Sequence, residues 1–246
     1  MSTSPAKFRL QVPAPGNLVV DRMVSEFLNL QPSQIDALDQ QCYVDHAQGE
    51  FRPVLSPPSR KASICFFGRD PGKDEVKAGL PFIGETGQTV RKTLAEVIEP
   101  SKPYTPELGL SIGESFFWMN TVPFKPEGNK PWRIAVRRAF QPVLKDVLVS
   151  QWEGSHVITL GSQAFHWFGL NQPALSRQRL ATFWAKTDKY ASSIEVQLKE
   201  GKGERTYTLH PLPHPSSANA TWKGRFSTLL KARLLDLDRQ CLSAKT

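Results

Sequence analysis

The chain has 246 residues, 39% of them hydrophobic, which suits one α/β domain, or a core with an extension, and argues against wholesale disorder. It contains no apolar run that could span a bilayer and no apolar signal-peptide core near its start, so we expect a cytoplasmic protein without membrane contacts. The net charge of +8 favours a polyanionic partner, because neutralised phosphates release counterions, although basic proteins often bind none.

The chain has only three cysteines, and their spacing argues against the common cysteine-based sites. Cys42, Cys65 and Cys241 are scattered and form no CxxC pair. An odd, sparse set argues against a disulfide framework and against a zinc site. We therefore interpret these residues as free buried thiols and expect neither a metal nor another cofactor.

Residues 1–60 are predicted to form an extension, partly helical, that packs on a core domain at residues 61–246. Residues 1–20 are rich in proline, and residues 21–47 show the apolar spacing of a helix. The apolar face of this helix holds Val24, Phe27 and Leu28. The stretch 52–60 carries three prolines and is interpreted as a connector into the core.

Within the core, short apolar runs alternate with helical patterns. The predicted strands are residues 63–67, 115–120, 156–160 and 205–209, the last as the second arm of a possible hairpin around 200–203. The predicted helices are 86–98, 133–150, a segment capped by Ser162, and 224–240, and Pro142 must kink or split the second of these. Strands that alternate with helices predict a three-layer α/β/α fold with a central, mostly parallel, four-stranded sheet.

Unusual polar loops follow the first, second and fourth predicted strands. In a parallel sheet such loops meet at the carboxyl ends of the strands, where these folds place their sites. The first loop, Gly68-Arg69-Asp70-Pro71-Gly72, has glycines that permit tight turns and close approach of a ligand. Asp70 could orient a water molecule there, although the pentapeptide alone favours a simple turn.

Two further residues could bind a flat, hydrogen-bonding ligand such as a base. Phe82 could offer a ring on which a base stacks, although in isolation a core position is the simpler interpretation. Asn120 ends a predicted strand, and its amide could pair with the adjacent acceptor and donor groups on the edge of uracil. The alternative for Asn120 is an ordinary strand or turn cap.

The last polar loop, residues 210–219, holds two of the five histidines, His210 and His214. A histidine here could stabilise a departing anion, and serine hydroxyls could hold phosphate. The alternative is a proline-rich surface loop.

The order and spacing of these segments resemble the uracil-DNA glycosylase superfamily. The series runs GRDPG, PFIG followed by GQ, an apolar strand ending in Asn120 before KPEGN, VITLG before a helix, and HPSS, and it covers roughly residues 63–235. PFIGETGQ and NTVPFKPEGN are most similar to the thermostable family 4. The Asp70 of GRDPG resembles the family 1 enzymes instead, and HPSS is similar to the family 1 and single-strand-selective types.

Two departures from the family patterns affect the expected site. Family 4 carries an iron–sulfur cluster on four cysteines, which three isolated cysteines cannot supply, so no cluster is expected. Family 1 has a bulky tyrosine after its Asp-Pro that blocks the methyl group of thymine, and this chain has Gly72 there. Discrimination against thymine must then come from elsewhere or be weaker.

The resemblance implies a monofunctional, monomeric DNA glycosylase that flips a nucleotide out of DNA and hydrolyses the bond between uracil and its sugar. It implies that Asp70 positions water and favours the sugar cation, and that His214 hydrogen-bonds the uracil anion. His214 is chosen over His210 because it is followed by Pro-Ser, as in the family motif, whereas His210 is expected to support it from the strand end. The substrate-binding residues that the resemblance implies are Gly68, Arg69, Phe82 and Asn120.

Contacts to the DNA backbone are expected from the last loop and from two basic stretches, residues 123–145 and 221–233. The residues expected to make these contacts are Lys125, Ser216, Ser217, Asn219, Lys223 and Arg225. Asn219 or Ala220 is a candidate to probe the place that the flipped base vacates. For most of the basic side chains, ordinary solvated helix faces are the alternative.

Other functions stay open on the sequence. A glycosylase of the same kind could act on hypoxanthine, xanthine or mismatched thymine. A non-catalytic DNA-binding member of the fold is a further alternative, although mere binding requires neither Asp70 nor His214. An unrelated phosphate-binding hydrolase is the last, but the chain has no GxxxxGK[ST] loop for a nucleoside triphosphate.

Overall fold

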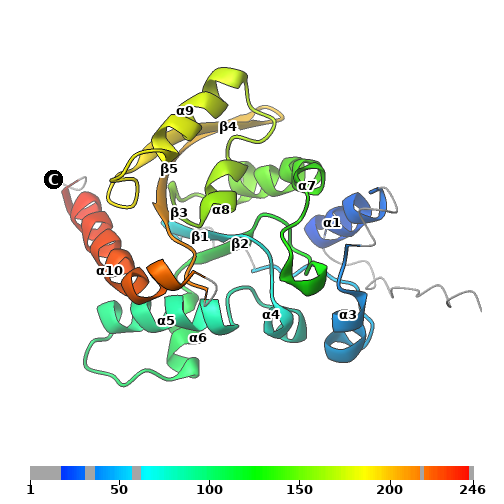
Figure 1. Ribbon diagram of the computed structural model, residues 1–246, viewed down its shortest axis with the longest axis horizontal. Helices are drawn as coiled ribbons and strands as arrows, with labels where there is room; N and C mark the ends of the chain where they lie inside the picture. Colours follow the sequence, from blue (N-terminus) through cyan, green and yellow to red (C-terminus); the bar gives the residue numbers. More distant parts are fainter. Residues whose placement is uncertain (1–17, 31–36, 57–61, 217–218, 244–246) are drawn as a thin grey trace, which may run out of the picture.

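A computed structural model of the chain describes residues 18–30, 37–56, 62–216 and 219–243. Within these residues the chain forms one sheet of five strands in the order β2-β1-β3-β5-β4 (Figure 1). The strands are β1 (Ile64–Gly68), β2 (Phe117–Asn120), β3 (His156–Leu160), β4 (Ile194–Glu200) and β5 (Gly203–Leu212). The first three and β5 are parallel, and β4 runs antiparallel to β5 at the edge.

Helices cover both faces of this sheet, as Figure 1 shows. One face carries α5 (Glu85–Ile98), α6 (Pro106–Gly113) and α10 (Ala220–Ser243). The other carries α1 (Leu18–Leu28), α7 (Ile134–Asp146) and α8 (Ser162–Trp167). The predicted three-layer α/β/α class is therefore confirmed. The sheet has five strands rather than the predicted four, because the first arm of the hairpin, β4, also pairs with β5.

Two hydrophobic cores follow from the alternation of side chains along the strands. In β1, Phe66 points to the face covered by α5 and α10, whereas Cys65 and Phe67 point to the opposite face. In β2, Trp118 stacks on Phe66 with ring centroids 4.8 Å apart. All three of the β1 side chains are fully buried, so the sheet is a rigid base for the loops at its end.

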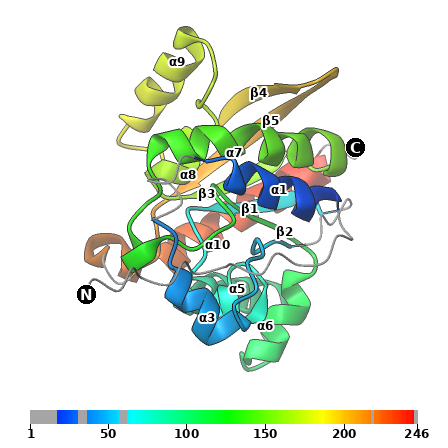
Figure 2. The same cartoon turned by 90° about the vertical axis from the view of Figure 1, so that its right-hand side faces the viewer.

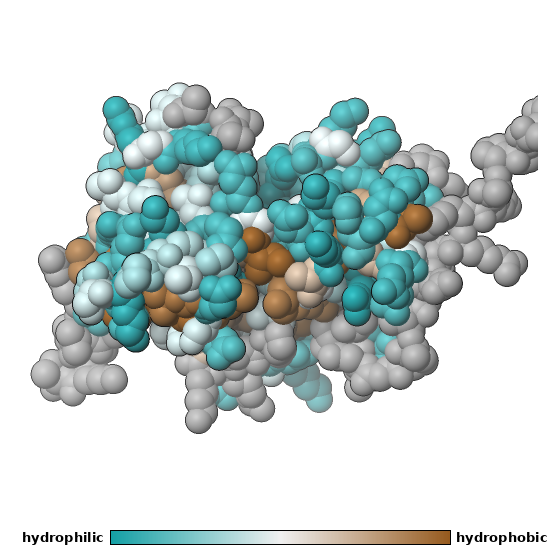
Figure 3. Space-filling view, turned by 90° about the horizontal axis from the view of Figure 1, so that it is seen from below, coloured by the Kyte–Doolittle hydropathy of each residue, from teal (hydrophilic) through white to brown (hydrophobic). Residues whose placement is uncertain are grey.

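The remaining elements lie around this core. They are α3 (Gln40–Ala47), α4 (Lys73–Ala78), a short 3-10 helix (Glu127–Asn129), a π-helical turn (Val147–Gln151) and α9 (Ala174–Trp184). Figure 2 shows α1 lying along α7, and α9 projecting beside the β4–β5 hairpin. Seen from below, hydrophilic residues cover most of two raised halves, and hydrophobic residues show chiefly in and beside the hollow between them (Figure 3). Among the described helices, none is both long and apolar enough to cross a membrane.

In the described part of the predicted helix at 21–47, residues 21–30 and 37–47, the chain forms two separate helices, α1 and α3. The second begins at Asp39, whose carboxylate accepts a hydrogen bond from the backbone N–H of Cys42 and so caps a new helix. Phe27 is fully buried against Phe51 and Phe124, as its place on the apolar face predicts. Leu28 does not share that face and is 48% exposed.

Pro142 does not split its helix, because another residue compensates for the hydrogen bond that proline cannot donate. The carbonyl of Arg138, four residues earlier, accepts a hydrogen bond of 3.2 Å from the Asn171 side chain. The α-helix then continues to Asp146 and passes into the π-helical turn. The predicted cap of α8 is also displaced: Gly161 caps the helix, and Ser162 is its first helical residue.

Candidate active site

A cleft of about 420 Å³ lies at the carboxyl ends of β1 and β2, beside the loop that follows β5. Four separate segments line it, as expected for loops that meet at one edge of a parallel sheet. Its lining includes Arg69, Asp70, Phe82, Asn120, Asn129, His214 and Ser216. The structure thus brings together the predicted residues Asp70, Phe82, Asn120 and His214, which the sequence separates by up to 144 positions (214 minus 70).

Asp70 is held in the cleft by Arg69 and Thr121. The Arg69 Nε–H donates to its Oδ2 at 2.9 Å, and the Thr121 hydroxyl, whose nearer acceptor is the Arg69 carbonyl at 2.6 Å, lies 3.4 Å from its Oδ1. The Asp70 side chain is only 1% exposed. Burial raises the pKa of Asp70 to about 7, although the positive charges of Arg69 and Arg137 lower it in part. A carboxyl group with such a pKa titrates near neutral pH, which is common at functional sites.

Phe82 and Asn120 line the cleft, and both side chains pack closely against Gly68, which does not line it. A Cβ added to Gly68 would lie 2.4 Å from the Phe82 ring and 2.9 Å from the Asn120 side-chain oxygen, so only glycine leaves room for both. Asn120 is 5% exposed, and its amide makes no hydrogen bond to any described residue. Its donors and its acceptor therefore remain available to a ligand in the cleft.

The backbone around Phe82 is strained, and a buried cation holds it. Phe82 has a φ of 58°, which is uncommon for a residue with a side chain. The Arg91 guanidinium donates to the carbonyl of Phe82 at 2.8 Å and lies over the Trp118 ring, 4.4 Å from its centroid. A Cβ at Gly87 would come within 2.0 Å of the Phe82 carbonyl, so Gly87 permits this conformation.

A buried carboxylate, Glu75, joins the loop after β1 to the segment that carries Phe82. Its two oxygens accept hydrogen bonds from the backbone N–H groups of Gly72, at 3.0 Å, and Gly84, at 2.9 Å. The sequence analysis missed this residue. Glu75 stands three residues after the N-cap Gly72, where a capping box has its glutamate, and this position could have indicated it, although Gly72 has no side chain to complete the pattern.

His214 lies across the cleft from these residues and is fixed by its own loop. The backbone N–H of Ser216 donates to its Nδ1 at 3.3 Å, and the Asn219 amide donates to its carbonyl at 3.1 Å. An Nδ1 that accepts a hydrogen bond carries no proton, so in the neutral ring the proton is on Nε2. Burial, together with the charge of Arg69, lowers the pKa of His214 to about 4, which keeps the ring neutral near pH 7.

Comparison with protein-family models matches residues 53–238 to the model described as "Uracil DNA glycosylase superfamily". The chain belongs to this superfamily. It is a family of DNA glycosylases, which implies that its members bind DNA. A search of curated proteins found no match.

His210, the other histidine of the predicted last loop, does not line the cleft. Strand β5 continues to Leu212, so His210 lies within the sheet, paired with Ile158, and not in a loop. It is fully buried, and its Nε2 lies 3.1 Å from the Nδ1 of His156. Burial, Arg233 and His156 lower the pKa of His210 to about 3. The expectation that it sits at the strand end is therefore wrong.

The predicted DNA-contacting residues are only partly gathered at the cleft. Ser216 lines it, and Lys223 and Arg225 are exposed in the first turns of α10, where Lys223 pairs with Glu85 at 3.0 Å. Asn219 is engaged with the His214 carbonyl. Ser217 lies outside the described residues.

Lys125 is the predicted contact that the structure does not present to DNA. Its side chain is 6% exposed, and its ammonium group donates to the Asp39 carboxylate at 2.7 Å and to the Pro126 carbonyl at 3.2 Å. The interaction with Asp39 ties the start of α3 to the loop after β2. In the described structure Lys125 is therefore a buried ion-pair partner, because Asp39, supplied by the N-terminal segment, neutralises it.

Within the described residues, no three His, Cys, Asp or Glu side chains gather as a metal site requires, and Cys42 and Cys65 are free and buried.

A larger cleft, of about 530 Å³, lies between α9 and β4, and Lys145, Arg179 and Glu195 are among its lining. It contains none of the predicted site residues. The smaller cleft is the candidate active site because buried titratable and hydrogen-bonding groups converge there.

Proposed function

We propose that this chain hydrolyses the N-glycosidic bond of uracil in DNA, releasing the free base and leaving an abasic sugar. The observation that supports this best is the convergence of Asp70, Asn120, Phe82 and His214 on one cleft at the carboxyl edge of the sheet. A carboxylate for water, an amide for a base edge, a ring for its face and a neutral imidazole for a departing anion are the groups that such a reaction needs. None of these steps uses a metal or a redox cofactor.

The substrate nucleotide has to leave the base stack before these groups can reach it. Extrusion of a nucleotide costs a few kcal/mol, and contacts in the pocket compensate for this cost. In the proposed complex the base lies against the Phe82 ring, and the Asn120 amide pairs with a carbonyl and the neighbouring N–H of uracil. Both side chains are preorganised by their contact with Gly68, so little further ordering is needed on binding.

The bond between the sugar and the base then breaks, and its electron pair leaves with uracil. The Nε2–H of His214 donates a hydrogen bond to the uracil oxygen on which negative charge develops. A neutral imidazole can do this without first giving up its proton, and the low pKa of His214 keeps it neutral. The Gly161 backbone, with a φ of 88°, passes close beneath His214 and supports it.

The sugar cation that remains is attacked by water. We assign the orientation of this water and the stabilisation of the cation to the Asp70 carboxylate. Thr121 and Arg69 hold that carboxylate by its two oxygens, which fixes the direction in which it can accept a proton from water. Because the pKa of Asp70 is about 7, only part of the free enzyme is in the working form at neutral pH.

The protein is proposed to act as a cytoplasmic monomer that binds the DNA backbone near the cleft. Ser216, Lys223 and Arg225 lie close in sequence to His214, and all three can contact phosphate. On the other side of the cleft, the Arg69 guanidinium donates to the Asn129 carbonyl at 2.8 Å and so links the loop after β1 to the loop after β2.

A release assay on DNA that carries one modified base tests the proposal. Four matched substrates would contain uracil, hypoxanthine, xanthine or mismatched thymine. Release of uracil at the highest kcat/KM supports the proposal, whereas release of another base alone would change the substrate. Some release of thymine is a specific alternative, because Gly72 leaves no side chain beside the cleft to exclude its methyl group. Tight binding without release from any substrate would favour a non-catalytic member of the fold.

A further inference from the structure

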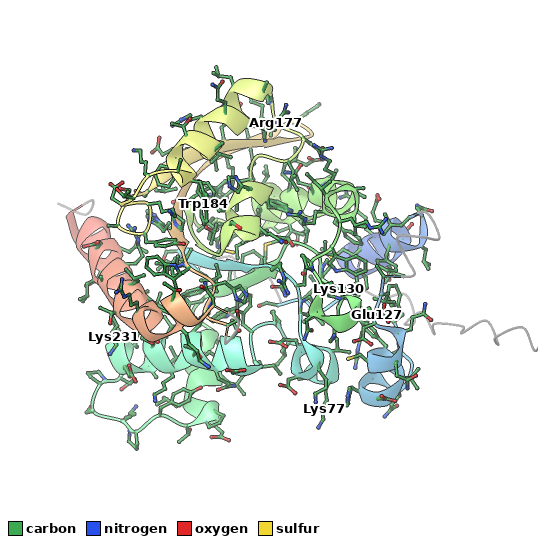
Figure 4. All side chains as sticks on the ribbon, in the orientation of Figure 1. Lys77, Glu127, Lys130, Arg177, Trp184 and Lys231 are labelled. Atoms are coloured by element: carbon green, nitrogen blue, oxygen red, sulfur yellow. The ribbon has the colours of Figure 1, made fainter. Side chains whose placement is uncertain are left out.

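A row of aromatic side chains runs across the surface beside the loop after β5, which carries His214, and has no part in the proposed reaction. It begins at the buried Phe165 of α8 and continues through Trp184, Tyr190 and Trp222. Successive ring centroids lie 5.0, 6.2 and 4.8 Å apart. Trp184 is the last residue of α9, and Figure 4 shows it at that end of the helix.

The outer members of this row are not core residues. Trp184, Tyr190 and Trp222 are all partly exposed. Trp184 also packs against the core that contains Phe165, whereas Tyr190 and Trp222 pack into neither of the two hydrophobic cores. Their mutual contacts are edge-on, with interplanar angles of 84° and 78°. Large aromatic side chains left partly in solvent on a surface usually mark a binding site.

Cations accompany the row. The Lys189 ammonium lies 5.2 Å from the centroid of Tyr190 and 5.7 Å from that of Trp184, and the Arg225 guanidinium lies 5.9 Å from that of Trp222. Lys186 is a third exposed cation in the same loop. In the part of the chain that the structure describes, none of these three forms a salt bridge. The one acid in this loop, Asp188, accepts a hydrogen bond from Ser192 at 2.6 Å.

The row is built into the fold. The buried guanidinium of Arg233, in α10, donates to the carbonyls of Tyr190 and Ser192 at 3.1 and 2.9 Å and so ties the loop to that helix. At its other end the row is joined to the loop after β5: the backbone N–H of Trp222 donates to the carbonyl of Asn219 at 3.0 Å, and the Asn219 side-chain amide donates to the carbonyl of His214. The Trp222 end of the row is therefore connected through Asn219 to His214, which lines the cleft.

We infer that this row, Trp184, Tyr190 and Trp222 with Lys186, Lys189 and Arg225, binds unpaired nucleotides that flank the nucleotide in the cleft. The inference rests on the proposed function, because it takes the strand in the cleft to be DNA. Aromatic rings bind bases by stacking, and cations between them bind the phosphates. In a duplex the faces of the bases are covered by their neighbours, so a row of rings gains little from paired DNA. The surface therefore favours single-stranded DNA as a substrate.

Binding of undamaged DNA tests the row without relying on catalysis. The probe is a single-stranded oligothymidylate of about 20 nucleotides, longer than one stacking groove, and the comparison is a duplex of equal length. We expect Tyr190→Leu to weaken single-strand binding about tenfold and to leave duplex binding unchanged, while Tyr190→Phe, which keeps the ring, binds like the wild type. Lys189→Gln should reduce the slope of log K against log salt concentration for single-strand binding by about one. Lys202→Gln, at the exposed β4–β5 turn, is the matched control and should leave this slope unchanged.

The outcomes separate the row from the proposed function. Single-strand binding that is unchanged in both Tyr190→Leu and Lys189→Gln overturns the inference, as does an equal loss on duplex or an equal loss in Tyr190→Phe. If the wild type releases no base from any DNA, the proposed function fails, and oligothymidylate binding still decides the role of the row. Melting temperatures identify a variant that has lost its fold, and Lys189→Gln changes a half-buried side chain whose one printed hydrogen bond is to the Lys186 carbonyl at 3.2 Å.

Discussion

The loop after β1 and the loop after β5 each bury one titratable group at the same cleft, and burial moves their pKa values in opposite directions. It raises the pKa of Asp70 to about 7 and lowers that of His214 to about 4. The cause is the same, because removal from water disfavours the charged form, which is the anion for aspartate and the cation for histidine. Near pH 7 the histidine is therefore settled in one state, whereas the aspartate is divided between two.

The two loops also hold their groups by different means. Side chains, those of Arg69 and Thr121, bind the carboxylate of Asp70. Backbone N–H and carbonyl groups hold His214, through Ser216 and Asn219. Single substitutions can consequently tune Asp70 over a wide range, but the state of His214 depends on the conformation of its whole loop.

The largest expected effect comes from removing the charge of Asp70. Asp70→Asn keeps the size of the side chain and should preserve folding, while single-turnover uracil release falls about a hundredfold or more, because oriented charge at the transition state is lost. DNA binding, measured by fluorescence anisotropy, should be near that of the wild type. Turnover close to normal would remove Asp70 from the reaction.

The second effect separates the two histidines. His214→Ala should lower single-turnover release about a hundredfold, as expected for the loss of one donor to a developing anion, without a large change in melting temperature. His210→Ala should instead lower stability by roughly 2 kcal/mol, because it leaves a cavity in the sheet, and should keep the rate of the folded protein. A severe loss of rate confined to His210→Ala would contradict this assignment.

The third prediction concerns pH. If the Asp70 carboxylate is the working form, kcat/KM should be level above pH 7 and fall about tenfold for each unit below it, as the group takes up a proton. His214 adds no change between pH 5 and 8, because its pKa is about 4. Arg69→Gln removes a charge that lowers the pKa of Asp70, so the midpoint should move to higher pH. A midpoint that stays in place in this variant would show that Arg69 does not control Asp70.

The smallest effect should come from the exposed cations of α10. Binding should weaken with salt, and Arg225→Gln should reduce the slope of log K against log salt by about one, because one phosphate contact is lost. Lys202→Gln is again a suitable control. An unchanged slope in Arg225→Gln would indicate that this residue faces solvent in the complex.

Much of the fold could be predicted from the sequence because its strands are short, continuous apolar runs. Such runs identify β1, β2 and β3 to within two residues. The alternation of Ile194, Val196 and Leu198 with polar residues indicates a strand, but only its pairing with β5 makes β4 part of the main sheet. The continuity of α7 through Pro142 could not be predicted either, since it depends on Asn171, which is distant in sequence.

The site divides in a similar way. Asp70, Asn120 and His214 could be found because they lie in motifs at strand ends, and Phe82 because it lies in the PFIG motif just before a helix. Residues that act through long-range contacts could not: Arg91 reaches the Phe82 carbonyl from a helix, and Asp39 neutralises Lys125 from the N-terminal segment. From its charge alone, Lys125 is predicted to contact phosphate. The folded structure is needed to show that the Asp39 carboxylate lies beside it.

The link between Gly72 and Glu75 limits how this cleft can change in evolution. A Cβ at position 72 would lie 2.7 Å from a Glu75 oxygen, so any larger residue there must displace the carboxylate that bridges Gly72 and Gly84. A mutation that closes this side of the cleft would at first loosen the segment that carries Phe82, and its effect would depend on the residue at position 75. A bulky side chain at position 72 therefore requires the Glu75 carboxylate to move, and a change at Glu75 removes that requirement.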